Sequence, residues 1–284
     1  MANTISSRTY RDKYRQASLA KLLRKSLVAE AICEVDRSDA KTIDNPYGSQ
    51  PTTVVQALAG TYSTAEYTTT DDTLTVAYEF IIAEHIFNFE EVLTKFNLFT
   101  NRMDEMNNSI KTTIDQYVVN SLCADGTGAY TTPAGGFTSP GNINAIMGDL
   151  LGKVAGYADS MKGLFLVIEN TDVSGFTQAQ ATNGYSVADA ALKNGFMDSY
   201  IGVDIYVVRT GTFTNTDIGD MTANNAGHRV FGVKDSATYA APRGIQVEEK
   251  GVTSKTGKEL VTFGYIGFKL WAPKAALIVD VTLA

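Results

Sequence analysis

The chain has 284 residues, with 24 lysines and arginines against 31 aspartates and glutamates, so its formal net charge is −7. Hydrophobic residues make up 44% and charged residues only 19%, which indicates a folded protein with fewer charges than the roughly 25% of average soluble proteins. A chain of this length can bury a core without disulfides or metal, and corresponds to about two domains. The acidic balance argues against a general nucleic-acid binder, because phosphate contacts need clustered Lys and Arg.

Two further classes are disfavoured by the order of the residues. No apolar run approaches the length of about 18 residues that a membrane-spanning helix needs. The start of the chain is rich in cations and lacks the apolar core and cleavage site of a secretory signal. Cys33 and Cys123 are the two cysteines, and they fit buried thiols in a reducing compartment better than a disulfide framework.

The charges are segregated along the chain. Residues 1–41 carry 9 cations and 5 anions, residues 42–94 carry 8 anions and no Lys or Arg, and residues 95–284 carry 15 cations and 18 anions. An acidic segment beside a basic one favours pairing, either within a chain or between identical chains. A solvated acidic face is the alternative interpretation.

The first elements in chain order are a helix and a hairpin. Apolar residues at a spacing of three to four predict a helix over 9–33, and the turn residues of 42–51 (TIDNPYGSQP) predict a loop. Residues 54–58 and the alternating residues 74–82 predict two strands, joined by a Thr-rich tip at 60–72. Because a two-stranded ribbon is marginal alone in water, we expect it to lie on another surface.

The strongest periodicity runs through 88–124 and predicts a long helix. Asn88 and Glu91 form a capping-box pattern at its start, and Gly126 is the expected stop. At 1.5 Å per residue this helix is on the order of 50 Å long. A bundle or coiled-coil helix is the alternative, although the chain offers no second helix of matching length.

The second half of the chain predicts an α/β stretch followed by a strand-rich end. Residues 125–141 predict a loop, and 251–258 predict the turn of a hairpin. The predicted helices are 142–156, 171–181 and 186–194, and the predicted strands are 164–168, 201–207, 229–234, 245–247, 259–271 and 275–283.

Neither histidine suggests catalysis or metal binding. His85 and His228 have no Cys, His or Glu at metal-ligand spacing, so we expect core or interface histidines. No Gly-x-Ser-x-Gly elbow occurs, and no local signature supports a Cys–His nucleophile pair. The stretch 251–259 is one residue too long for a phosphate loop and has Glu259 where a Mg²⁺-binding hydroxyl belongs. We therefore predict no catalytic, cofactor-binding or metal-binding residues.

The order of these segments resembles the major capsid proteins of tailed bacteriophages, the Hong Kong 97-like fold. The resemblance covers nearly the whole chain and is carried by the strand LTVAYEFII at 74–82 with NFEEV at 88–92, the long helix, and the ending GYIGFKLWAPKAALIVD at 264–280. It implies an α+β fold with an N-terminal arm, an extended β-hairpin loop, a long spine helix, a peripheral domain and an axial domain. The implied bounds are 1–49 for the arm, 50–87 for the extended loop, 88–156 for the peripheral domain with the spine helix at 88–124, 157–240 for the axial domain and 241–284 for the C-terminal peripheral strands.

The resemblance also implies a function. The chain would be a structural protein and no enzyme, without a cofactor, that self-assembles through hexamers and pentamers into an icosahedral head shell around double-stranded DNA. The implied location is the virion, after assembly in the host bacterial cytoplasm. The implied partners are further copies, non-specifically contacted DNA on the inner face, a portal and decoration proteins.

Two departures from the family refine these expectations. Some members cross-link through a Lys in the extended loop, and residues 42–94 contain none. Some carry a cleaved N-terminal scaffolding domain, but only about 50 residues precede the hairpin here, so we expect a separate scaffolding protein.

The charge segregation gives a contact hypothesis between subunits. We expect cations of the arm to meet carboxylates on the hairpin of a neighbour: Arg8, Arg11, Lys13 and Arg15 against Glu66, Asp71 and Asp72. The competing role for the arm is to bind packaged DNA. The competing functions for the whole chain are an encapsulin-like nanocompartment shell, a mixed α/β enzyme, and another phage structural protein such as a head decoration or tail component.

Overall fold

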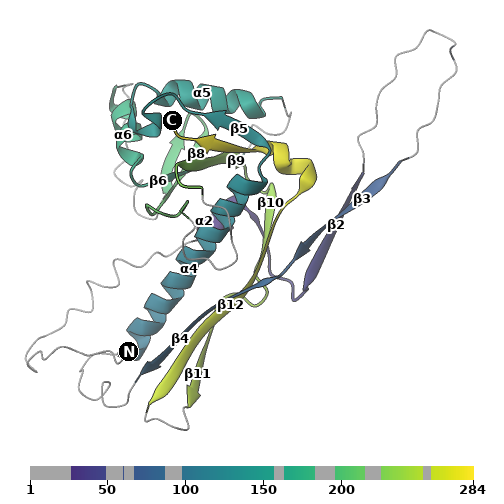
Figure 1. Ribbon diagram of the computed structural model, residues 1–284, viewed down its shortest axis with the longest axis vertical. Coiled ribbons are helices and arrows are strands. Elements are labelled where there is room, and N and C mark those ends of the chain that lie inside the picture. Colours follow the sequence, from purple (N-terminus) through teal and green to yellow (C-terminus); the bar gives the residue numbers. More distant parts are fainter. Residues whose placement is uncertain are drawn as a thin grey trace, which may run out of the picture.

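Two sheets, one long helix and a projecting two-stranded ribbon make up the fold (Figure 1). The computed structural model describes residues 27–48, 60, 67–86, 98–156, 163–182, 196–214, 225–251 and 257–284. The helix α4 (Leu98–Asp125) runs between the sheets, and its 28 residues make it about 42 Å long at 1.5 Å per residue.

The larger sheet forms a compact lobe with helices on both faces. Its strands lie in the order β5 (Gly128–Thr131), β13 (Ile278–Thr282), β9 (His228–Val233), β6 (Leu164–Glu169), β8 (Val203–Val208) and β7 (Phe196–Tyr200). Leu166 on β6 packs in a cluster with α5 (Ile143–Val154) and α6 (Val173–Thr182). Phe165 faces the other way, into the cluster formed by α4. Every residue of β6 is therefore buried, as a strand covered on both faces requires.

The second sheet is long and narrow. It contains β1 (Glu34–Asp36), β10 (Ala237–Ala240), β12 (Lys258–Leu270) and β11 (Gln246–Gly251), and β4 (Tyr78–Ile86) pairs with β12. α4 packs on one face of it through Ile114 and Tyr117. The short helix α2 (Val28–Ile32) is fixed to α4, because the buried carboxylate of Asp115 accepts a hydrogen bond from the Ala29 amide at 2.9 Å. Such an acceptor satisfies a free N–H group of the first helical turn.

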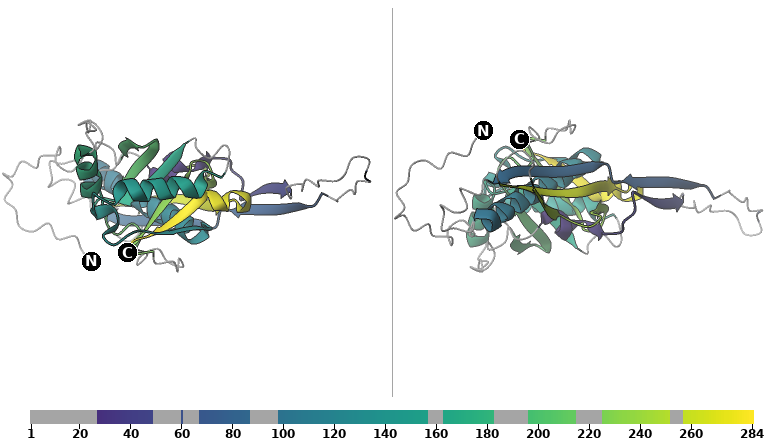
Figure 2. Two further views of the ribbon diagram at one scale, coloured as in Figure 1. Left: turned by 90° about the horizontal axis from the view of Figure 1, so that it is seen from above. Right: turned by 90° about the horizontal axis from the view of Figure 1, so that it is seen from below.

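The ribbon pairs β2 (Thr42–Gly48) with β3 (Thr69–Thr75) in antiparallel register. It leaves the long sheet and extends from one end of the molecule in both views of Figure 2. The two remaining elements are short 3₁₀ helices, η2 (Gly136–Thr138) and η3 (Ala272–Leu277).

Several elements expected from the sequence are confirmed. The helices expected at 142–156 and 171–181 are α5 and α6, and the buried strand at 164–168 is β6. β11 and β12 pair in antiparallel register on either side of the expected turn at 251–258, of which residues 252–256 lie outside the described residues. α4 confirms the long helix over 98–124 and α2 the end of the first one. The rest of the expectations at 9–26, 54–58, 88–97 and 186–194 lies outside the described residues.

The loop expected at 42–51 is wrong, because residues 42–48 form β2. Its turn-forming residues misled the prediction: Pro46 stands opposite Asp71 within the ribbon. A two-stranded ribbon has open edges on both sides, so a strand can accept a proline that lacks the N–H group. Leu74 pairs with Ile43 of β2, and the strand expected at 54–58 lies outside the described residues.

The single strand expected at 74–82 is divided between two structures. It breaks at Val76 and Ala77, so that β3 belongs to the ribbon while β4 pairs with β12. The loop expected at 125–141 contains β5, which pairs with β13 from the other end of the chain. The strand expected at 275–283 begins only at Ile278, since η3 precedes it. β1 and β10 were not expected either, because partners distant in sequence stabilise them. β7, which pairs with the adjacent β8, was also missed.

The sheets group the chain differently from the expected domain bounds. α5, within 88–156, and β13, within 241–284, both pack in the lobe. β10, within 157–240, belongs to the long sheet. The chain therefore crosses between the two sheets more often than a division at 156 and 240 suggests.

Candidate functional site

The ribbon is a projecting structure with almost no core of its own. Leu74 is the one buried residue in β2 and β3. The chain itself thus stabilises the ribbon only near its base, and a two-stranded ribbon is marginal without a supporting surface. The remaining exposed length is available for contact with another molecule.

The base of the ribbon crosses the long sheet at a glycine. Leu74 packs with Ala240 and Trp271, and the ribbon passes directly over Gly267 of β12. A Cβ atom at Gly267 would lie 2.9 Å from the carbonyl oxygen of Thr75, which is closer than side chains tolerate. Glycine is therefore required at this crossing, where two backbones approach closely.

The carboxylate of Asp72 also holds the base of the ribbon to the chain, through an ion pair and a hydrogen bond. This carboxylate lies 2.9 Å from the Lys269 ammonium and accepts a hydrogen bond from the Ala272 amide at 3.0 Å. Burial alone would raise the pKa of Asp72, but the Ala272 amide and the Lys269 ammonium outweigh it and hold the pKa below its ordinary value. The direction of the ribbon is thus fixed by an apolar contact and an ion pair.

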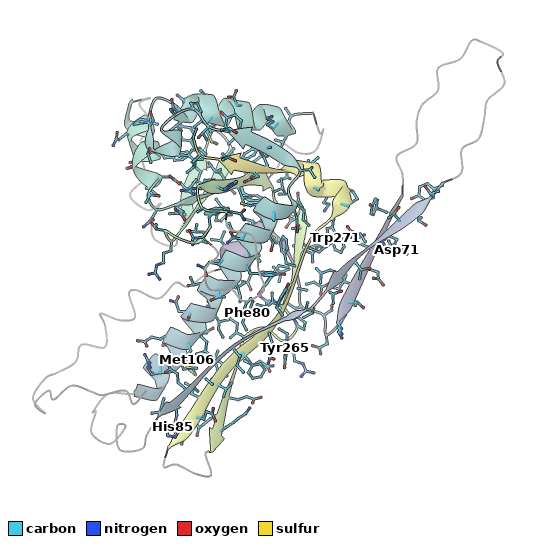
Figure 3. The ribbon with its side chains drawn as sticks, in the orientation of Figure 1. Asp71, Phe80, His85, Met106, Tyr265 and Trp271 are labelled. Carbon is cyan, nitrogen blue, oxygen red and sulfur yellow. The ribbon has the colours of Figure 1, made fainter. Side chains whose placement is uncertain are left out.

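The long sheet exposes apolar side chains on the face opposite α4. Ile81 is 59% exposed and Tyr265 is 42% exposed. Phe263 stands opposite Ile81 across the strands and contacts the Tyr265 ring edge-to-face at 5.9 Å. We call Ile81, Phe263 and Tyr265 the outer-face patch. In Figure 3, Phe80 lies between β4 and α4, whereas Tyr265 lies on the far side of β12. Grouped exposed apolar residues indicate an interaction surface.

The sheet that carries this patch is braced by α4. Arg102 donates to both carboxylate oxygens of Glu84 at 3.0 Å and 3.0 Å, and to Glu105 at 2.5 Å. Farther along the helix, the Tyr117 ring packs against the rings of Tyr78 at 5.2 Å and Phe80 at 6.2 Å. The patch and the ribbon base therefore rest on one stiff platform, as a binding surface needs.

The buried charges of the lobe satisfy one another. Arg229 donates to Asp172 at 2.5 Å and to Glu169 at 3.2 Å, and all three side chains are largely buried. The Phe213 ring lies 5.1 Å from the guanidinium carbon. The second carboxylate oxygen of Glu169 accepts a hydrogen bond from the Gly211 amide at 2.9 Å. These contacts are typical of a structural ion-pair network, because charges buried in a protein need oppositely charged partners.

The histidines and cysteines have structural positions. His228 lies 2.8 Å from the carboxylate of Asp280, and His85 is half-buried at the end of β4. Cys33 and Cys123 are buried free thiols, which confirms their expected burial. Burial, aided by nearby carboxylates, raises the pKa of both thiols, so neither is a reactive thiolate.

Among the described residues, no group of three or more His, Cys, Asp or Glu side chains could hold a metal ion. No helix formed by these residues is long and apolar enough to cross a membrane.

Two of the seven charged residues of the contact hypothesis, Asp71 and Asp72, lie within the described residues. Arg8, Arg11, Lys13, Arg15 and Glu66 lie outside the described residues. Asp71 and Asp72 are consecutive on β3, so they point to opposite faces of the ribbon. Asp71 is exposed (Figure 3), whereas Asp72 is only 12% exposed in its pair with Lys269.

Sequence reasoning missed the residues that anchor the ribbon and those of the outer-face patch. One signal was present: residues 259–271 carry apolar side chains at both odd and even positions, among them Phe263, Tyr265 and Ile266. A strand that is apolar on both faces needs cover on both. The role of Gly267 had no such signal, since it depends on a crossing between segments almost 200 residues apart.

Comparison with solved structures identifies the fold. The capsid structure of the cyanophage P-SCSP1u matches with a TM-score of 0.72 over 99% of this chain and 93% of that chain, at 12% identity. A chain of Mycobacterium phage Che8 matches with a TM-score of 0.71 over 98% and 97%, at 15% identity. The capsid of an empty GTA particle matches with a TM-score of 0.69 over 99% and 95%, at 14% identity.

The other comparisons add no relative. No family model matches the chain, and no curated protein matches it in sequence. The likeness is therefore one of fold, and it extends from one end of the chain to the other. With its ribbon, long helix and two sheets, the chain has the α+β, Hong Kong 97-like fold found in phage and GTA capsid proteins.

Proposed function

We propose that the chain is the major capsid protein of a tailed bacteriophage or of a related gene-transfer particle. In this role it self-assembles into an icosahedral head shell that encloses double-stranded DNA, and it catalyses no reaction. The observation that carries the proposal is the end-to-end match to capsid chains, which spans 99% of this chain. Because a fold alone does not determine function, the exposed surfaces of the single chain are the second support.

Assembly accounts for surfaces that an isolated chain leaves unused. The ribbon has one buried residue, and the outer-face patch exposes apolar rings. In a shell both would lie against neighbouring copies, where stable interfaces bury about 1,200–2,000 Å² in total. The proposal assigns α4 and the long sheet to a peripheral domain, the lobe to an axial domain, and the ribbon to the extended loop that reaches a neighbour. Copies that each reach onto the next neighbour in this way would close into rings, which are the proposed hexamers and pentamers.

The carboxylates of the ribbon have different roles in this proposal. Asp72 already pairs with Lys269 of its own chain, so Glu66 and Asp71 are left to receive Arg8, Arg11, Lys13 or Arg15 from a neighbour. Each exposed pair contributes only about 0–1 kcal/mol, but every copy repeats it. Replacing Glu66 and Asp71 with Lys should block closure of shells if the arm pairs with the ribbon. Shells that still close and contain DNA would instead favour an arm that binds DNA, because the substitutions leave the cations of the arm in place.

The proposed partners follow from the same role. They are further copies of the chain, DNA held non-specifically on the inner face, a separate scaffolding protein, a portal and decoration proteins. The proposed location is the virion, after assembly in the bacterial cytoplasm.

Electron microscopy of the purified full-length protein tests the proposal. We expect uniform closed shells in negative stain, because the exposed surfaces are buried only in the assembly. Monodisperse monomers at high concentration would contradict the proposal. The contents of particles taken from the producing cells test the finer statement: double-stranded DNA supports a phage or gene-transfer head, whereas protein cargo without nucleic acid supports an encapsulin-like compartment.

A further inference from the structure

The turn between β7 and β8 holds an isoleucine in a backbone conformation that isoleucine disfavours. Tyr200 pairs with Val203, which leaves a two-residue turn of Ile201 and Gly202 with φ values of 53° and 76°. Two successive positive φ angles characterise the type I′ hairpin turn, for which Asn-Gly is the preferred sequence. Glycine fits the second position, but a β-branched residue at the first is an outlier that strains the chain.

Ile201 also exposes its side chain. The side chain is 52% exposed, and it is the one large exposed apolar residue among the lobe residues whose side-chain exposure the structure describes. The other large exposed apolar residues belong to the ribbon segment or the long sheet: Tyr67, Tyr78, Ile81, Val247 and Tyr265. A single exposed apolar residue is ordinary, but here exposure and backbone strain fall on the same residue.

The other described non-glycine residues with positive φ show which side chains an exposed turn favours. Asp235, with φ of 59°, uses its amide and carbonyl to bind Ile32 and Lys274 at 3.0 Å and 2.8 Å. Arg243, with φ of 61°, is polar, 67% exposed and 3.5 Å from Asp39. Both are polar residues, as exposed turns favour. Ile201 is the apolar exception.

The hairpin that carries Ile201 is firmly held. Val203 is fully buried, and Tyr200 is 3% exposed while its hydroxyl donates to Asn144 at 2.5 Å. β7 is the edge strand of the lobe sheet, so the turn lies where another molecule can reach it. A rigid apolar tip of this kind suits insertion into a small recess, because little conformational entropy is lost on binding.

We infer that Ile201 is an assembly contact that inserts into an apolar recess of a second copy of this chain. The inference rests on the proposed function. One isoleucine is far smaller than the 20–30 residues per side of a stable interface, so it cannot hold a partner by itself. A copy already bound through the ribbon and the outer-face patch is the partner that such a small contact fits. The contact joins different surfaces of the two copies, as ring-forming interfaces do.

The substitution Ile201→Asn separates the two properties of this residue. Asn favours the turn and removes the apolar group, so the melting temperature of the unassembled subunit should stay equal or rise by about 2 °C. The protein concentration needed for shell formation, measured by light scattering, should rise about tenfold. Ile201→Val keeps the apolar group and should assemble at a concentration near that of the wild type.

The matched control is Arg243→Asn, which relieves the same backbone conformation at an exposed polar residue and should leave assembly unchanged. Assembly of Ile201→Asn at the wild-type concentration would overturn the inference, and so would a clear fall in its melting temperature. If the wild type itself forms no shells, the proposed function fails and this inference fails with it. Failure of the inference alone shows as wild-type shells together with unimpaired Ile201→Asn shells.

Discussion

The lobe and the ribbon bury their residues in opposite ways. All six residues of β6 in the lobe are buried, because α4 covers one face and α5 and α6 cover the other. In β3 of the ribbon, only Leu74 of seven residues is buried. Burial of apolar surface contributes about 25 cal/mol per Å², so the lobe is stabilised within the chain. The ribbon is stabilised at its base and otherwise depends on a surface outside it.

This difference predicts two kinds of mutational effect. Substitutions in the lobe should lower the free energy of unfolding of the subunit. Substitutions in the ribbon or the outer-face patch should leave the subunit folded and change its assembly instead, because interactions that exist only in the assembled state stabilise that state alone.

The largest effect on the subunit is expected from Arg229→Met in the lobe. The substitution leaves the buried carboxylates of Glu169 and Asp172 without their cation, and breaking a buried pair in this way costs about 3–5 kcal/mol. Denaturant titration of the unassembled subunit measures the loss.

The control for this prediction is Arg37→Met. Arg37 pairs with Glu30 at 3.2 Å but is 69% exposed, so the expected change is within about 0.5 kcal/mol. Equal effects of the two substitutions would refute the contrast between a buried network and a surface pair.

Leu74→Ala should release the ribbon without unfolding the lobe. Leu74 is fully buried against Trp271 and Ala240, and truncation of a buried leucine costs about 2–5 kcal/mol. Because the lost contact lies only at the ribbon base, hydrogen exchange should accelerate in β2 and β3 while the amides of β6 stay protected. Thr70→Ala, at an exposed position of the same strand, is the control. Faster exchange of β6 in Leu74→Ala would show that the ribbon and the lobe unfold together.

The sequence predicted the lobe better than the ribbon, for physical reasons. β6 is an apolar run flanked by two amphipathic helices, so its pattern alone predicts a covered strand. β2 contains Asn45, Pro46 and Gly48, which are turn-forming residues, and it is a strand only because β3 pairs with it. Where tertiary pairing opposes local propensity, sequence patterns mislead.

The candidate site shows the same limit. The segregation of charge drew attention to the acidic segment 42–94, but it did not distinguish Asp71 from its neighbour Asp72. The difference between them depends on Lys269 and the Ala272 amide, which lie almost 200 residues away. A local sequence pattern cannot predict such a long-range contact. The amphipathic period of α4, in contrast, can be recognised from neighbouring residues of the sequence.

Acidification should loosen the base of the ribbon. The fold lowers the pKa of Asp72. The ion pair of Asp72 with Lys269 therefore stabilises the ribbon base fully at pH values above the ordinary carboxyl pKa of about 3.9. That stability is lost as the pH falls through the lowered pKa of the folded state, because protonation removes the charge that Lys269 binds. Hydrogen exchange of β3 measured between pH 5 and pH 3, after correction for the intrinsic rate, should therefore show a rise at the acid end. In Asp72→Asn this extra rise should disappear, and its persistence would mean that another group controls the base.

The smallest effect on the subunit is expected from Ile81→Thr in the outer-face patch. Ile81 is 59% exposed and Thr keeps the β-branched shape that strands favour, so the free energy of unfolding should change by no more than about 0.5 kcal/mol. The assembled particle should nevertheless dissociate at a lower denaturant concentration, since the apolar contact is lost at every copy. Ile82→Thr is the matched control one residue away: its side chain faces α4, so it should destabilise the subunit itself. If Ile81→Thr and Ile82→Thr affect the subunit equally, the two faces of the long sheet are not divided between folding and assembly, and the contrast between the molecule's inner and outer surfaces fails at this point.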